Sequence, residues 1–142
     1  MSGPATGQDI TLQAGDTAQI HIPVKDDAGN YVDLSGIQRA RWWLGKSAKA
    51  TGADVYLKKD SNSTMVCDDG VTRNQVEWEA FETDKWRLVV HLKGADTETG
   101  VSPIPKTGAS YYHEAEIVDA DGNIATVSTG SAELVASIVR NL

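Results

Sequence analysis

The sequence predicts an all-β protein that folds as an antiparallel sandwich of about seven to nine strands. Apolar and polar residues alternate through most of the chain, which is the pattern of a half-buried strand. Clusters of Asp, Gly and Asn interrupt this alternation roughly every 8–12 residues, as the turns of a sandwich do. Apolar residues at the three- and four-residue intervals of a helix are nearly absent.

The first half of the chain contains three predicted strands and two segments with a weaker strand pattern. The strands are residues 8–15, 18–25 and 38–45, and the weaker segments are 55–59 and 64–67. Pro23 lies inside the second of them and cannot donate a backbone hydrogen bond, so we expect that strand at a sheet edge. Residues 26–30, with the sequence DDAGN, form a hairpin-type turn.

The second half supplies five more predicted strands. They are residues 75–80, 86–92, 111–118, 124–130 and 132–139. In the first of these, Val76, Trp78 and Ala80 share one face and are predicted to point inward. Residues 94–108 are expected to be irregular, with one helical turn near 95–99.

Length and composition indicate one globular domain. The 142 residues are 40% hydrophobic and 23% charged, which is not the composition of a disordered chain. We divide the chain into an N-terminal arm at residues 1–8 and a sandwich domain at 9–142.

The charge balance argues against nucleic-acid and membrane partners. Thirteen Lys and Arg against 20 Asp and Glu give a net charge of −7, whereas such partners are bound through basic surfaces. No apolar stretch reaches the roughly 20 residues of a membrane span. Residues 1–8 lack the apolar region of a signal peptide, so we expect synthesis in the cytoplasm.

No motif indicates catalysis, a cofactor or a metal. Cys67 is the single cysteine, which excludes an internal disulfide and a multi-cysteine metal site. Residues 119–123 begin like a calcium loop, but Gly130 stands where the bidentate Glu belongs, so a turn is expected. Strand parity places His113 inward as a satisfied core histidine, and His21 and His91 outward. We expect a non-enzymatic protein.

The candidate interface lies on strand 38–45. Trp43 is predicted to point outward beside Arg41 and Arg39, a combination typical of protein-interface hot spots. Three alternatives remain open: the indole stacks on a sugar ring, the loop at 46–54 covers it, or the strand lies between two packed layers.

The N-terminal arm supplies the other candidate interface residues. They are Met1, Ser2, Gly3 and Pro4. The arm is small and polar and has no core to join, so we expect a partner subunit to hold it in place.

Two segments resemble the small immunoglobulin-like domains of tailed-phage virion proteins, in particular the N-terminal domain of baseplate upper proteins. These segments are ITLQAGDTAQIHIPVKDDAGNYVDLSG at 10–36 and GASYYHEAEIVDADGNIATVSTG at 108–130. The resemblance implies an immunoglobulin-like sandwich with a structural role in the virion. In baseplate proteins a helical linker follows this domain, whereas here the chain ends at Leu142, which favours a small accessory subunit.

The resemblance therefore predicts a head-decoration or neck subunit that binds capsid, neck or tail proteins, or copies of itself. Acidic charge favours a position on the outside of the particle. A tail or baseplate adaptor is one alternative, and a carbohydrate- or receptor-binding module is another. No cofactor is implied.

Overall fold

The computed structural model describes residues 8–98, 100–105 and 107–136. Within them lie ten strands and two short helices. In chain order they are β1 (Ile10–Gln13), β2 (Ala18–Pro23), β3 (Arg39–Gly45), η1 (Gly52–Asp54), β4 (Val55–Asp60), β5 (Thr64–Val66), β6 (Thr72–Asn74), β7 (Val76–Glu82), β8 (Lys85–Leu92), α1 (Gly94–Thr97), β9 (Ala109–Val118) and β10 (Ile124–Val135). None of the helices in the described part of the chain is long and apolar enough to cross a membrane.

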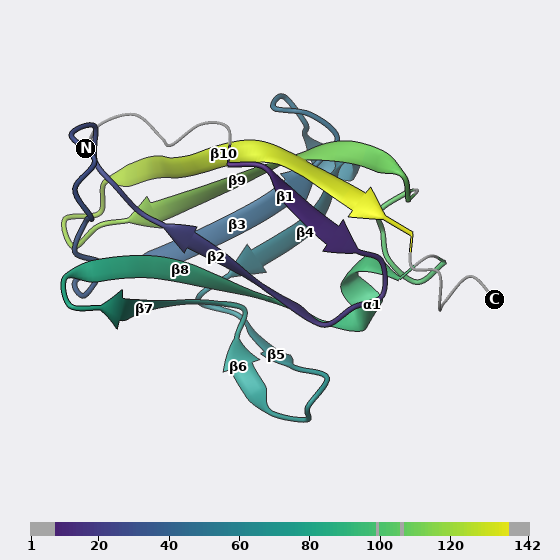
Figure 1. Cartoon of the computed structure of the whole chain (residues 1–142), viewed down its shortest axis with the longest axis horizontal. Helices are drawn as coiled ribbons and strands as arrows, with labels where there is room; N and C mark the ends of the chain where they lie inside the picture. Colours follow the sequence, from purple (N-terminus) through teal and green to yellow (C-terminus); the bar gives the residue numbers. More distant parts are fainter. Residues whose placement is uncertain (1–7, 99, 106, 137–142) are drawn as a thin grey trace.

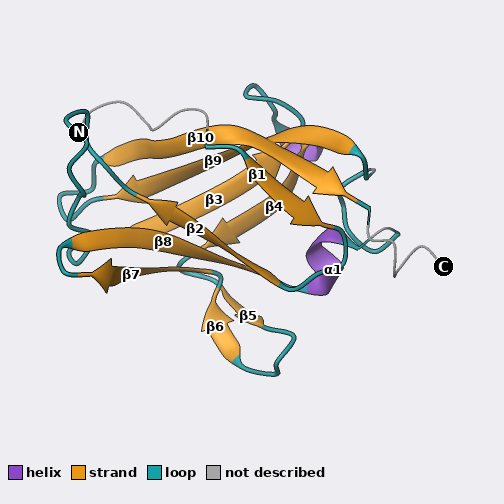
Figure 2. Ribbon diagram, viewed as in Figure 1, coloured by secondary structure: helices purple, strands orange, loops and turns teal. Residues whose placement is uncertain are grey.

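Eight of these strands form two facing sheets (Figures 1 and 2). One sheet has the order β1-β10-β9-β3-β4 and the other β2-β8-β7. The strand order is that of an immunoglobulin-like sandwich, with β3, β9 and β10 in the places of strands C, F and G. The predicted all-β sandwich is confirmed. Neighbouring strands are antiparallel except for β1, which runs parallel to β10.

The core fills the space between the two sheets. Its fully buried side chains include those of Trp42, Leu44, Leu88, Val90 and Ile117. All five lie on β3, β8 or β9, at positions where alternation turns the side chain toward the other sheet. Pro23 ends β2, an edge strand of the smaller sheet, as expected from its missing N–H.

The structure corrects the predictions in the second half of the chain. Residues 124–130 and 132–139 were expected as two strands, but β10 runs unbroken to Val135, with a register shift between Thr126 and Ser128. Residues 137–139 lie outside the described residues. The strand β6 was not predicted. It pairs with β5 in a hairpin that projects from the sandwich (Figure 1).

Two side chains differ in burial from their predicted positions. Ala80 keeps the parity of Val76 and Trp78, since its pairing with Trp86 continues the same register, but it lies near the end of β7 and is exposed. His91 is only 6% exposed, although its strand parity is outward. It sits on the middle strand of its sheet, with Nε2 2.5 Å from Glu77 Oε1 on β7.

Candidate functional site

Strand β3 presents the predicted interface side chains on the outer face of the five-stranded sheet. Trp42 on the opposite face is fully buried, so the alternation fixes Trp43 outward. Trp43 is 41% exposed, so the loop at 46–54 does not cover its indole. This loop instead borders one flank of the indole through Ser47, Ala48 and Ala50.

Trp43 stands between opposite charges on the two neighbouring strands. It pairs in register with Lys58 on β4 and with Glu114 on β9. The Lys58 ammonium lies 4.7 Å from the indole centre, a cation–π contact. Glu114 Oε1 accepts a hydrogen bond of 3.2 Å from the Thr126 hydroxyl. The exposed aromatic ring thus has a cation on one side and a carboxylate on the other.

The adjacent row of residues is a set of ion pairs. Arg41 is in register with Asp60 on β4 and Glu116 on β9, and its guanidinium pairs with Glu116. Arg39 donates from Nε to both Asp60 carboxylate oxygens, at 3.0 and 3.1 Å. This hydrogen bonding holds the pKa of Asp60 below its usual value. Both arginines are therefore fixed, which preorganises the face around Trp43.

Arg41, Trp43, Glu114 and Glu116 line a depression of about 310 Å³ on this face. The depression lies on a hydrogen-bonded part of the sheet, since β3 pairs with β4 on one side and with β9 on the other. We call these four residues the Trp43 depression. It combines an aromatic wall, two carboxylates and one guanidinium, which suits recognition of a polar or charged group.

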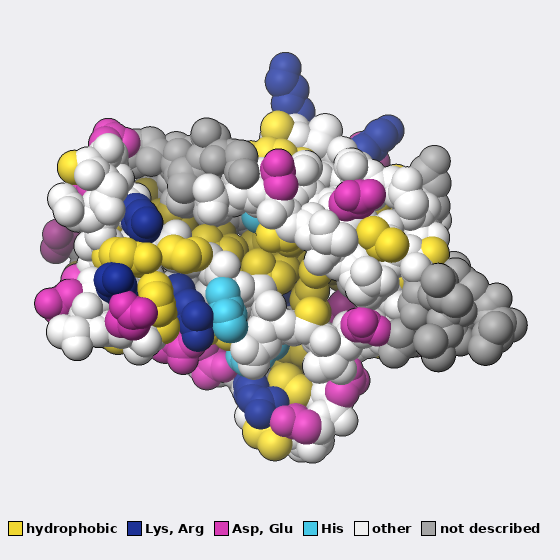
Figure 3. Space-filling view, viewed as in Figure 1, with side chains coloured by type: hydrophobic (Ala, Val, Ile, Leu, Met, Phe, Trp, Pro, Cys, Tyr) yellow, Lys and Arg dark blue, Asp and Glu magenta, His cyan; other side chains and the backbone are white. Residues whose placement is uncertain are grey.

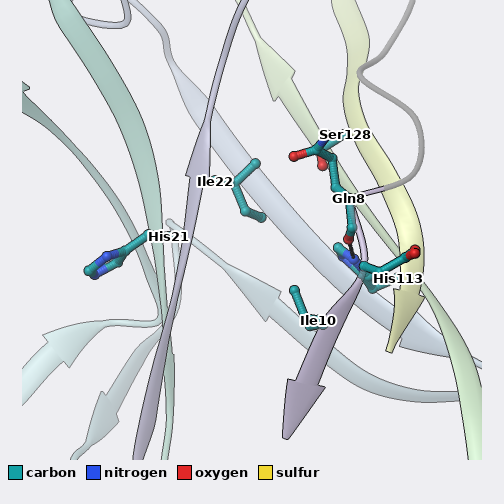
Figure 4. Close-up of a pocket in the computed structure, with 7 residues that line it drawn as sticks. Gln8, Ile10, His21, Ile22, His113 and Ser128 are labelled. Carbon is teal, nitrogen blue, oxygen red and sulfur yellow. Dashed lines mark hydrogen bonds between the residues drawn. The ribbon is translucent and has the colours of Figure 1, made fainter. Parts of the chain in front are cut away.

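A second recess opens between the edge strands of the two sheets. It holds about 230 Å³ and is lined by residues from β1, β2, β9 and β10. On the face drawn in Figure 3, charges of both signs are interspersed, and apolar atoms line a hollow between β10 and β2. Figure 4 shows Ile10 and Ile22 on its walls and the Ser128 side chain pointing into it. The Ser128 hydroxyl is buried and has no partner among the described residues.

His113 borders this recess with both ring nitrogens engaged. The Trp42 indole N–H donates to Nδ1 over 3.2 Å, so Nε2 carries the proton and donates to the Gln8 carbonyl at 2.5 Å (Figure 4). The ring is fully buried, and this burial lowers its pKa. The predicted satisfied core histidine is confirmed.

The turn aspartates act as caps. Asp119 Oδ1 accepts hydrogen bonds of 2.9 Å from the backbone N–H groups of Asp121 and Asn123, which confirms the predicted turn. The described residues contain no cluster of three His, Cys, Asp or Glu side chains able to hold a metal. The predicted interface residues Met1, Ser2, Gly3 and Pro4 lie outside the described part of the chain.

Sequence reasoning found half of the Trp43 depression. It identified Trp43 and Arg41 on β3 but not Glu114 and Glu116 on β9. It did not join them, because β3 and β9 are far apart in the sequence and their pairing leaves no local signal. Lys58 was missed for another reason: alternation does not give the register in which β4 pairs with β3.

No protein-family model matches the sequence, and no curated protein matches it. A chain from a solved structure on T cell specificity and activation by the bacterial superantigen toxic shock syndrome toxin-1 is similar to this chain. The likeness has a TM-score of 0.41 and 8% sequence identity, and covers 89% of this chain and 92% of that one.

Proposed function

We propose that this chain is a non-catalytic binding domain that docks on another protein through the Trp43 depression, as an accessory subunit of a tailed-phage particle. The observation that carries the docking function is the 41% exposed indole of Trp43 on a central strand, next to a depression. Trp and Arg are the side chains most enriched among interface residues that dominate binding.

The rigidity of this face supports the proposal. Ion pairs already hold Arg39 and Arg41 in place, so little conformational entropy remains to be lost when a partner binds. The charged side chains that surround the indole form a polar rim of the kind that encloses an interface hot spot.

The virion setting rests on the resemblance of segments 10–36 and 108–130 to small phage virion domains. Copy number in purified particles tests it, by quantitative mass spectrometry against the major capsid protein. We expect either hundreds of copies, as for a shell-decorating subunit, or a small multiple of about six or twelve, as for the neck or tail. Absence of the chain from particles would refute this setting.

The docking function is tested by replacing Trp43 with Ala. We expect a moderate destabilisation of about 1–2 kcal/mol, because the indole is only partly covered, with the fold retained and incorporation into particles lost. Ile124→Ala is the matched control, since Ile124 is 63% exposed at the start of β10 and outside the depression. Equal incorporation by Trp43→Ala and the control would contradict the proposal.

Carbohydrate binding is the second candidate function. The depression places the indole beside two carboxylates and a guanidinium, which are able to bind sugar hydroxyls while the ring stacks on the sugar. Survival of particle assembly in Trp43→Ala together with loss of glycan binding would favour this function over docking.

A further inference from the structure

The charges of the residues that line the Trp43 depression do not balance, since Lys58 lies outside it. Of the residues that line it, Arg41 is cationic and Glu114 and Glu116 are anionic. Arg41 is committed to Glu116 by an ion pair. Among the described residues Glu114 has no ion pair, and its carboxylate receives the hydroxyl of Thr126. One uncompensated negative charge therefore faces the depression.

The environment of Tyr112 is consistent with that excess charge. Tyr112 lies two residues before Glu114, on the same face of β9. The pKa of its hydroxyl is raised, mainly by burial and to a smaller extent by the negative charge of Glu114. A negative charge without a neighbouring cation disfavours a second negative charge beside it.

The indole offers its two flanks to different groups. Lys58 on β4 already lies against the ring, which shows that the ring's environment accommodates a cation. The depression is lined from β3 and β9, on the side away from β4. A second cation placed there would contact both the indole and the carboxylate of Glu114.

From this geometry we propose that the Trp43 depression receives an arginine side chain of the partner protein, with the guanidinium stacked on Trp43 and hydrogen-bonded to Glu114. This inference rests on the docking function proposed above and names the chemistry of the partner. Arginine fits better than lysine, because its planar guanidinium both stacks on an aromatic ring and donates two parallel hydrogen bonds to a carboxylate. The net charge of −7 would also draw a basic surface toward this chain.

The first experiment titrates the whole protein with N-acetyl-arginine amide and follows the Trp43 indole N–H signal by NMR. N-acetyl-lysine amide and the uncharged N-acetyl-glutamine amide serve as comparison probes. We expect saturable shifts with arginine, weaker binding of lysine and no saturable binding of glutamine. Raising the salt from about 0.05 to 0.5 M should weaken arginine binding, because the depression is open to solvent. Equal binding of arginine and glutamine would overturn the proposal.

Glu114→Gln is the decisive variant, because it keeps the shape of the side chain and removes the charge. We expect it to weaken arginine binding about tenfold, as the loss of a partly exposed charge-assisted hydrogen bond does. Glu133→Gln is the matched control: Glu133 is an exposed glutamate on β10 that pairs with Ser110, outside the depression, and it should bind as the wild type does. Equal losses in both variants would mean that net charge alone attracts the probe, and would overturn the proposal.

The arginine proposal and the docking function fail in different ways. If Trp43→Ala abolishes incorporation while Glu114→Gln and the arginine probe have no effect, docking stands and the arginine is refuted. If methyl glucoside saturates the Trp43 signal and arginine does not, the depression binds sugar and the arginine proposal is likewise refuted.

Discussion

The imidazole of His113 is held in its neutral form by its surroundings. A second proton would have to sit on Nδ1, where the Trp42 N–H already points. The ring is fully buried, and its burial outweighs the favourable contributions of the Gln8 carbonyl and Asp9, so the pKa is lowered below 6.5. Asp9 and His21 are the other titratable side chains that line the recess, and the pKa of His113 is lowered in their presence.

This lowered pKa predicts a pH dependence of stability. Because the folded-state pKa lies below the unfolded value, the contribution is fully present above about pH 6.5. It is lost as the pH falls from there through the folded-state pKa. Urea unfolding at a series of pH values should show this decline in the wild type. His21→Gln, which changes an exposed histidine, should retain it, and His113→Gln should reduce it.

An NMR titration of the His113 ring checks the same point without a variant. A His113 pKa at or above 6.5 in the folded protein would contradict the prediction.

A buried ion pair ties β4 to α1. Lys59 Nζ lies 2.9 Å from Asp96 Oδ2, and the two side chains are only 7% and 17% exposed. Asp96 also accepts the backbone N–H of Lys93, so the pair fixes the start of the helical turn. The carboxylate compensates an ammonium that would otherwise be buried alone.

We predict that Asp96→Ala destabilises the fold by about 3–5 kcal/mol, because it leaves the Lys59 ammonium buried and unpaired. Adding Lys59→Met to it should recover most of the loss, since an apolar side chain of similar length needs no counterion. Chemical denaturation of the single and double variants measures both effects. A double variant no more stable than Asp96→Ala would show that the charge is not the cause.

At the scale of elements, β1 depends on one glycine. The chain at Gln8 passes directly over Gly130 of β10, so closely that a Cβ there would overlap the Gln8 carbonyl and lie 2.9 Å from its nitrogen. Three hydrogen bonds fix this crossing: Gln8 N–H to Thr129, His113 to Gln8, and Ser131 N–H to Asp9. The absence of a side chain at Gly130 therefore allows β1 to enter its pairing with β10.

Gly130→Ala should displace the start of β1 and destabilise the protein by about 1–3 kcal/mol. Hydrogen exchange at the β1 amides should accelerate before exchange in β3 or β9 does. Gly36→Ala is the control, since a Cβ there meets nothing within 4 Å, and it should change stability by less than about 1 kcal/mol. Unchanged β1 exchange in Gly130→Ala would contradict this account.

The elements that sequence predicted well are those with strict alternation. In β9 the inward positions from Tyr111 to Ile117 are all buried, and in β3 Trp43 is assigned to the outer face correctly. Prediction failed at Ala80, which has inward parity but lies near the exposed end of β7, and at β6, which is only three residues long and pairs with β5 outside the two main sheets. Such features depend on the partner strand and not on local pattern.

At the scale of the whole molecule, the sandwich could be predicted but the arrangement of its surface could not. Recurrent turns and alternation indicate two sheets, whereas the strand order decides which side chains meet. Trp43 and Glu114 become neighbours only because β3 and β9 pair, and the recess beside His113 exists because β1 and β2 are edges of different sheets.

The parallel pairing of β1 with β10 has a mechanical consequence. Because these strands run in the same direction, the chain enters the pair at Ile10 and leaves it at Val135, at opposite ends of their shared hydrogen bonds. Tension applied through the two chain ends therefore slides β1 along β10 and loads those bonds together, in shear, instead of opening them one at a time. The pairing of β1 with β10 therefore resists tension along the chain, because several hydrogen bonds have to break at once.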